Sequence, residues 1–186
     1  MTVQLCETIV GTAVRDIRHG FEIALADGPD IQAYRALRRR AFCDELGLFE
    51  RSDTDEHDDT ATVLVARLRG RVVGGVRLYE VTPGWWHGGR LVVAGDQRGA
   101  AGTGSALVAA ACAQAEAVGA LRFEAAVLPG NAALFARLGW DVVRSVQVGG
   151  RAHILVGWAR RRVPAPPRWS PATTSRPPCH QPGVTS

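Results

Sequence analysis

Two spacings of hydrophobic residues recur along the chain and predict its elements. Alternation of apolar and polar residues indicates strands over residues 21–26, 62–69, 72–80, 90–93, 121–128, 141–148 and 152–158. Apolar residues three or four positions apart indicate helices from residue 31 to near Gly47, over 103–118 and over 131–138. The elements therefore follow the order β-α-β-β-β-α-β-α-β-β.

The connections between these elements indicate how the strands are arranged. Gly70-Arg71 and Gly149-Gly150 separate strand pairs closely enough to form hairpins, whereas residues 82–89 have the composition of a long connection. Gly119 closes the second helix as a C-cap. Hairpins combined with helical crossovers predict an α/β fold with a mixed, mostly antiparallel central sheet and helices on both of its faces.

Length and charge indicate one domain with a basic tail. The chain has 186 residues, of which 46% are hydrophobic and 22% charged, and this suits a single globular domain. We expect an N-terminal extension over residues 1–20, the folded domain over 21–159 and a disordered Pro/Arg-rich tail over 160–186. All 18 acidic residues and 17 of the 22 basic ones precede residue 160, so the body carries −1 and the tail +5. The excess positive charge therefore does not indicate a nucleic-acid partner, and contact of the tail with RNA or acidic lipid is the less favoured alternative.

Other compositional signals exclude further classes of function. No apolar run approaches the roughly 20 residues that cross a bilayer, and residues 1–20 lack the pattern of a secretory signal. We therefore expect no membrane partner and a cytoplasmic location. The four cysteines form no Cys-x-x-Cys pair, so neither a disulfide framework nor a metal site is expected.

The segment Arg98-Gly-Ala-Ala-Gly-Thr-Gly104 lies between a predicted strand and a predicted helix. Unsatisfied N–H groups at a helix start favour an anion, and glycines let the main chain approach a phosphate closely. The segment is therefore suited to a pyrophosphate, although a plain strand-to-helix turn would also use glycine. It lacks the Gly-Lys-Ser/Thr ending of a P-loop, and Leu107 stands where a dinucleotide fingerprint needs glycine.

Two motifs in order give a specific resemblance. Residues 91–107 resemble the pyrophosphate-binding motif of the GNAT (N-acetyltransferase) superfamily, and residues 131–140 are similar to its later motif, an Asn and a short helix ending in Leu-Gly-aromatic. The resemblance covers residues 21–158 and implies acetyl-CoA or another acyl-CoA as co-substrate, attacked directly by an amine. The residues implied in binding the acyl-CoA are Val92, Val93, Arg98, Gly99, Gly102, Thr103, Gly104, Ser105, Asn131 and Phe135.

Three positions depart from the family pattern. The spacing Arg-x-x-Gly-x-Gly is longer by one residue, so either Arg98 or Gly99 takes its first position. Phe135 stands where a tyrosine often protonates the leaving thiolate. Gly89-Arg90 stands where a glutamate base is common. The resemblance thus leaves both the acid and the base unassigned.

The N-terminal half also resembles the acyl-homoserine-lactone synthases, which share the GNAT fold. Leu48 and His87 differ from their tryptophan and glutamate, and the clear Gly-rich turn is a further difference. Nitrogen-starvation-associated GNAT proteins show a similar mixture, and that subgroup is a hypothesis for this chain. The residues that match the synthases, and so are implied in acceptor binding, are Arg38, Phe42, Asp55, Asp58, Arg77 and Arg90.

The remaining candidates concern the acceptor and the base. The acidic residues of 50–59 form either a solvated loop or a surface that attracts a cationic acceptor. Glu80 at a strand end and His87 in the following segment could each take the proton of the amine through a water. Of Trp85 and Trp86, we expect one to line the acceptor pocket, with Trp86 as the candidate, and one to pack.

The sequence therefore predicts an acyl-CoA-dependent N-acyltransferase, most simply an N-acetyltransferase, acting on a small-molecule amine without a metal. A homodimer is an additional expectation. The alternatives are a CoA-binding sensor that lost catalysis and an enzyme like the acyl-homoserine-lactone synthases.

Overall fold

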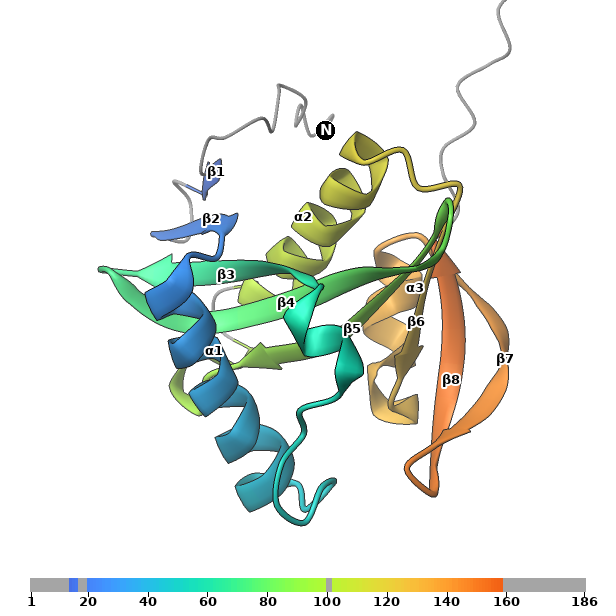
Figure 1. The fold of residues 1–186 in the computed structure, drawn as a ribbon, viewed down its shortest axis with the longest axis horizontal. Coiled ribbons are helices and arrows are strands. Elements are labelled where there is room, and N and C mark those ends of the chain that lie inside the picture. The colour runs from blue at the N-terminus through green and yellow to red at the C-terminus, as the bar shows by residue number, and fades with distance from the viewer. Residues whose placement is uncertain (1–13, 17–19, 100–101, 159–186) are drawn as a thin grey trace, which may run out of the picture.

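A computed structural model describes residues 14–16, 20–99 and 102–158 (Figure 1). The tail expected over 160–186 and most of the extension expected over 1–20 lie outside the described residues. The strands are β1 (Val14–Asp16), β2 (Phe21–Leu25), β3 (Thr62–Leu68), β4 (Arg71–Thr82), β5 (Trp85–Val93), β6 (Arg122–Val127), β7 (Trp140–Val148) and β8 (Arg151–Trp158). The α-helices are α1 (Gly28–Arg39), α2 (Thr103–Ala117) and α3 (Ala132–Arg137). The π-helix is η1 (Arg40–Glu45), and the 3-10 turns are η2 (Glu56–Asp59), η3 (Gly95–Gln97) and η4 (Pro129–Asn131).

The strands form one sheet in the order β1-β2-β3-β4-β5-β6-β8-β7. Within the described part, every neighbouring pair is antiparallel except β5 and β6. Helices α1 and α2 cover opposite faces: a Cβ built on Gly75 would meet the ring of Tyr34 on α1, and one on Gly74 would meet Leu107 on α2. The expected mixed, mostly antiparallel sheet with helices on both faces is confirmed.

The core is divided by the sheet into two clusters. The larger one lies on the α2 face and includes Leu107, Ala111, Phe123 and Trp140. The smaller one lies beneath α1, around the fully buried Tyr34. Two successive glycines on β4 let both helices approach the sheet at the same place, because a side chain at either position would collide with a neighbouring helix.

Helix α1 begins at a complete capping box. Asp27 accepts a hydrogen bond from the N–H of Asp30 at 3.0 Å, and Asp30 accepts one from the N–H of Asp27 at 3.2 Å. Arg67 of β3 holds Asp30 against the sheet. The helix continues into η1, so helical backbone reaches Glu45, close to the predicted end near Gly47.

The prediction of a long connection over residues 82–89 is wrong. Residues 82–89 turn tightly at Pro83-Gly84 and enter β5 at Trp85, which makes β5 nine residues long. Gly84 has a φ of 78°, and its N–H donates to the carboxylate of Glu80 at 2.8 Å. The consecutive Gly88-Gly89 concealed the strand. Gly88 is needed there because a Cβ would lie 3.0 Å from the ring of Phe123.

Candidate active site

Strands β5 and β6 pair at one end and separate at the other. Their parallel register runs from Trp85↔Arg122 to Gly88↔Ala125 and then stops. β5 continues beside β4 to Val93, whereas β6 continues beside β8 to Val127. No strand of the described part pairs with this edge of β5 beyond Gly88, so the main-chain groups there that no side chain binds are open to a ligand.

A bulge in β5 lies within this open stretch. Gly89 pairs with Arg77 and Val92 with Gly75, so two residues of β5 face a single residue of β4. Arg90 takes a φ of 52° there, and its carbonyl accepts a hydrogen bond from the hydroxyl of Tyr34 at 2.8 Å. The bulge turns the side chain of Arg90 toward the α1 face.

The Gly-rich turn leads from the open end of β5 into α2. Gly99 and Gly102 have φ values of 84° and 64°, a conformation that favours glycine. Gly102 is the N-cap of α2 and supplies no capping side chain. Thr103 is buried, and its hydroxyl has no hydrogen-bond partner among the described residues. The start of this 15-residue helix thus keeps unsatisfied donors, and it fits a pyrophosphate. Residues 100 and 101 lie outside the described residues.

The other residues implied in acyl-CoA binding differ in how they are placed. Gly104 and Ser105 follow in the first turn of α2, and a Cβ at Gly104 would come no closer than 3.8 Å to Val93. Arg98 donates to the carbonyl of Val93 at 2.9 Å and to Glu45 at 2.7 Å, so its guanidinium already has partners. Val92 is buried beneath α1.

Where β5 and β6 separate they leave an opening with two arms: β5 and the Gly-rich turn form one, and β6 with β8 forms the other. The later motif follows β6 and so belongs to the second arm. Asn131 is exposed at the end of η4 and is the N-cap of α3, and its side chain forms no capping hydrogen bond with the described residues. Phe135 is buried, with its ring 5.3 Å from Trp140 in the core. Because its side chain carries no acidic proton, Phe135 supplies no general acid.

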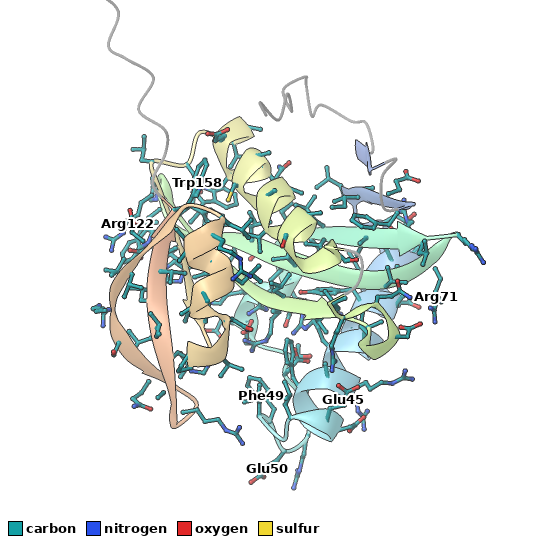
Figure 2. The ribbon with its side chains drawn as sticks, turned by 180° about the vertical axis from the view of Figure 1, so that it is seen from behind. Glu45, Phe49, Glu50, Arg71, Arg122 and Trp158 are labelled. Atoms are coloured by element: carbon teal, nitrogen blue, oxygen red, sulfur yellow. The ribbon has the colours of Figure 1, made fainter. Side chains whose placement is uncertain are left out.

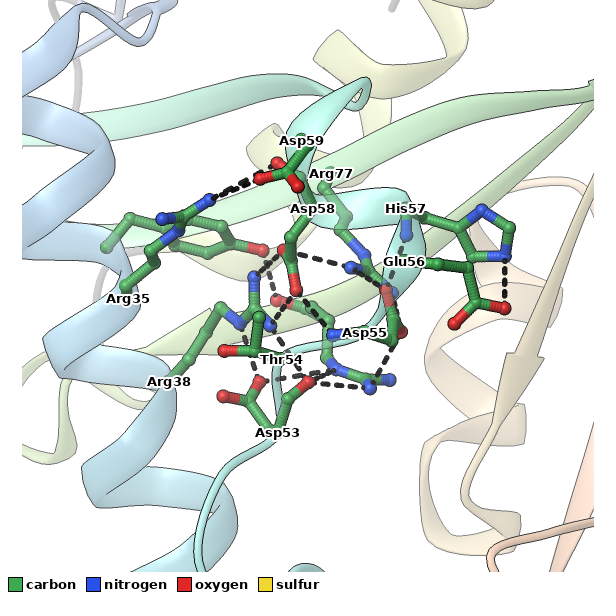
Figure 3. A network of polar contacts seen from close by, with 12 residues as sticks. Arg35, Arg38, Asp53, Thr54, Asp55, Glu56, His57, Asp58, Asp59 and Arg77 are labelled. Atoms are coloured by element: carbon green, nitrogen blue, oxygen red, sulfur yellow. Dashed lines mark hydrogen bonds and ion pairs between the residues drawn. The ribbon is translucent and has the colours of Figure 1, made fainter.

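On the α1 face, six charged side chains form a closed ring of ion pairs (Figure 3). Asp53 pairs with Arg38 at 2.6 Å and with Arg90 at 3.2 Å, and Asp55 pairs with Arg90 at 3.0 Å and with Arg77 at 2.5 Å. Asp58 closes the ring between Arg77, at 2.9 Å, and Arg38. The three aspartates come from one loop, and the arginines come from α1, β4 and β5.

The ring fastens the acidic loop to the sheet. Arg38 and Arg77 are 1% and 2% exposed, so water does not screen their pairs. Burial raises the pKa of Asp58, but hydrogen bonds from Arg38 and from the N–H of Asp55 outweigh it and hold that pKa well below its ordinary value. These arginines and Asp58 bind one another and are closed to solvent, whereas Asp55 and Arg90 remain partly exposed. Phe42, expected beside them, packs against the cluster beneath α1.

Beside this ring, His87 and Glu124 lie where β5 and β6 begin to separate. They are register partners, and His87 Nε2 lies 3.6 Å from a carboxylate oxygen of Glu124. Glu124 is 3% exposed and accepts hydrogen bonds from Trp85 Nε1 at 3.1 Å and from Arg122 at 2.6 Å. Burial lowers the pKa of His87 below its ordinary value, and the negative charge of Glu124 opposes that shift. A neutral imidazole, able to accept a proton, therefore predominates near neutral pH.

Aromatic rings surround this pair. Tyr79 lies opposite His87 with ring centroids 6.0 Å apart, and His57 stacks on Tyr79 at 3.8 Å. Trp85 meets His87 edge-on at 5.5 Å. The α1 face next to the opening thus carries a half-buried aromatic wall with two histidines, of which His87 lies beside Glu124.

Two predicted residues are not on this face. Trp86 packs against the core on the α2 side, so Trp85, not Trp86, is the tryptophan beside His87. Glu80 is the register partner of Trp86, and directly opposed residues point to the same face. Glu80 is exposed, binds the turn at Gly84, and is separated from the base candidate His87 by the sheet.

Glu124 was missed from the sequence. It interrupts the apolar run of residues 123–127 with a charge, and an acidic residue inside a buried strand is a signal of a paired or functional carboxylate. The role of Asp53 in the ring was also missed, because nothing in the sequence distinguishes it from the other acidic residues of 50–59.

A family model named acetyltransferase (GNAT) family matches residues 29–140. The chain belongs to the GNAT acetyltransferase family. It is therefore a member of an acyltransferase family, as the two sequence motifs predicted. No curated protein matches it in sequence.

Solved structures share the fold at low identity. An N-acetyltransferase assigned in Lactobacillus plantarum is 21% identical, with a TM-score of 0.68 over 75% of this chain and 97% of its own. An acyl-CoA N-acyltransferase from Pseudomonas aeruginosa is 20% identical, with a TM-score of 0.64 over 75% and 99%. The AHL synthase LasI is 16% identical, with a TM-score of 0.60 over 74% and 89%. The expected resemblance in fold to both groups is confirmed, while the nitrogen-starvation subgroup stays a prediction.

The part of the chain that the structure describes has neither a candidate metal site nor a helix that could span a membrane. No group of three or more His, Cys, Asp or Glu side chains there could hold a metal ion. None of the helices in the same part has the length and apolar character that crossing a membrane requires.

Proposed function

We propose that the protein is an acyl-CoA-dependent N-acyltransferase that transfers an acyl group, most simply acetyl, to a small-molecule amine. The observation that carries the proposal is the continuity of three features: the uncapped start of α2, the unpaired edge of β5, and His87 where β5 and β6 separate. An extended ligand with a phosphate at one end would run along that edge and bring its acyl end toward His87.

The chemistry requires little beyond positioning and one base. Bound acyl-CoA supplies a thioester. The amine nitrogen forms a bond to the carbonyl carbon, the carbon–sulfur bond breaks, and the proton of the amine passes to His87, directly or through a water. The thiolate of CoA then takes a proton from solvent, which is adequate because an ordinary thiol has a pKa near 8.5.

Glu124 would orient the base in this proposal. Nε2 is the buried nitrogen of His87 and faces the Glu124 carboxylate, which leaves Nδ1 to accept the proton. Main-chain N–H groups on the open edge of β5 would stabilise the oxyanion that forms at the carbonyl. Asp55 and Arg90 are the members of the charged ring exposed enough to touch an acceptor.

Acyl-CoA binding can be tested by ligand-induced thermal stabilisation. Acetyl-CoA at about 100 times its Kd should add about 2.7 kcal/mol, or roughly 5–10 °C in Tm. Gly102→Asp should abolish this shift, because it puts a negative charge in the anion site. Gly149→Asp is the matched control, since Gly149 also has a positive φ, 56°, but lies in the β7–β8 hairpin. If acetyl-CoA raised the Tm of both variants equally, the acyl-CoA would not bind at the start of α2.

A further inference from the structure

Residues 45–53, here called the strap, run from the last residue of η1 to Asp53 of the charged ring and contact both arms of the opening. Figure 2 shows the labelled Glu45, Phe49 and Glu50 of this segment. The strap lies on the α1 side of the sheet, the side on which His87 and Glu124 face each other.

On the β5 arm, the strap is held at three points. Glu45 accepts a hydrogen bond from Arg98 of the Gly-rich turn at 2.7 Å. The ring of Phe49 lies 4.8 Å from the guanidinium carbon of Arg90, and the carbonyl of Asp53 accepts from the same side chain at 2.8 Å. The strap is thus tied to the bulge of β5 and to the turn that follows it.

On the β6 arm, the strap is held by one residue far away in sequence. Arg151 donates to the carbonyl of Gly47 at 2.9 Å. Arg151 is the first residue of β8, and β8 pairs with the open end of β6 at Val127↔Ile154. The strap therefore bridges the two arms, because it is fastened to β5 and its turn on one side and to β8 on the other.

We propose that the strap is a size filter on the acceptor: it admits small amines to His87 and excludes amines carried on polypeptides. This inference rests on the proposed acyltransferase function and names its acceptor class. A small amine has no attached main chain that the strap could obstruct. A lysine side chain or a polypeptide N-terminus brings attached main chain, which must pass where the strap crosses from one arm to the other.

The contacts at Glu45 and Gly47 are the latches that can be removed. Both are exposed at the surface, and each should favour the closed strap by about two- to tenfold. The double variant Glu45→Gln/Arg151→Ala removes both while leaving His87, Glu124 and the charged ring intact. The matched control is Glu50→Gln/Arg144→Ala, which makes the same chemical changes in the strap and in the β7–β8 hairpin. Both residues are exposed, and their side chains form no hydrogen bond or ion pair with the other described residues.

The decisive assay compares acetyl transfer to a small amine and to an unstructured peptide with one free amine. In the latch variant, kcat/KM for the peptide relative to the small amine should rise about three- to tenfold, and in the control it should stay within twofold. The ratio cancels any change in acetyl-CoA affinity that follows from freeing Arg98. An unchanged ratio in the latch variant overturns the filter, as does a native protein that already prefers the peptide.

Limited trypsin digestion gives a readout that needs no activity. Arg51 lies exposed within the strap, so cleavage after it reports opening of the segment. The latch variant should be cut there about three- to tenfold faster than the control. Equal cleavage shows that the latches do not hold the strap and overturns the filter. Acetyl-CoA binding without transfer to any amine overturns the proposed function, and the filter with it, whereas transfer with an unchanged ratio overturns the filter alone.

Discussion

Replacing Glu124 by glutamine removes a buried negative charge 3.6 Å from His87 Nε2 and nearly preserves the shape of the side chain. In the native protein, burial lowers the pKa of His87 and Glu124 opposes that effect. Without the carboxylate, the pKa of His87 should fall further. The acidic limb of the pH profile of kcat, where the base becomes protonated, should therefore move to lower pH.

The size of the movement follows from the geometry. Two unit charges 3.6 Å apart interact by about 5 kcal/mol at an effective dielectric constant of 20. Arg122 already neutralises part of the charge of Glu124 through its 2.6 Å hydrogen bond, so a fraction of that energy remains for His87. We expect the acidic limb to move down by about one to two pH units, and the plateau to fall about three- to tenfold because the base is weaker.

The assay is chromatographic measurement of released CoA between pH 5 and 9, at saturating acceptor and acetyl-CoA. Glu56→Gln is the matched control: it removes an exposed carboxylate that lies 3.8 Å from His57 instead of His87. A limb that stays in place in the Glu124 variant, or that moves equally in the control, would refute the assignment of His87 as the base held by Glu124.

Two further comparisons use neighbouring residues as controls. His87→Asn should lower turnover by about ten- to a thousandfold at unchanged acetyl-CoA affinity. Turnover of Glu80→Gln should stay within twofold of the native value, because Glu80 is on the other face of the sheet. A larger loss in the Glu80 variant than in the His87 variant would identify Glu80 as the base. Asp58→Asn should lower the free energy of unfolding by about 3–5 kcal/mol, since it leaves the buried Arg38 without a full set of partners. Asp59→Asn should change that free energy by less than about 0.5 kcal/mol, because the side chain of Asp59 is 90% exposed. Urea unfolding measures both, and equal values would show that the ring adds no stability.

Most of the fold followed from periodicity, and the error at β5 has a local cause. The strands with clean alternation and the helices with apolar spacing were found within a few residues. Residues 85–89 contain two glycines, which propensity assigns to a loop. The structure needs those glycines because Phe123 packs over Gly88 and the bulge follows directly. Tertiary packing, which a single sequence does not display, decided that segment.

The parts of the site that lie together in sequence could be predicted, whereas the parts that combine residues from distant segments could be predicted less well. The Gly-rich turn was found because its glycines lie together in sequence. His87 was a candidate, but its partner Glu124 is 37 positions away and becomes its neighbour only through the parallel register of β5 and β6. The charged ring joins residues of four segments, so the sequence supplied its members by resemblance and the contacts among them came from the structure.

The central claim is acyl transfer from CoA to a small amine, and incubation of the protein with acetyl-CoA and a panel of small amines tests it most directly. Mass spectrometry should find an acetylated amine in amounts equal to the free CoA released, with His87→Asn lowering both together. Retention of acetyl-CoA binding without any acetylated product across the panel would contradict the claim and support the sensor alternative.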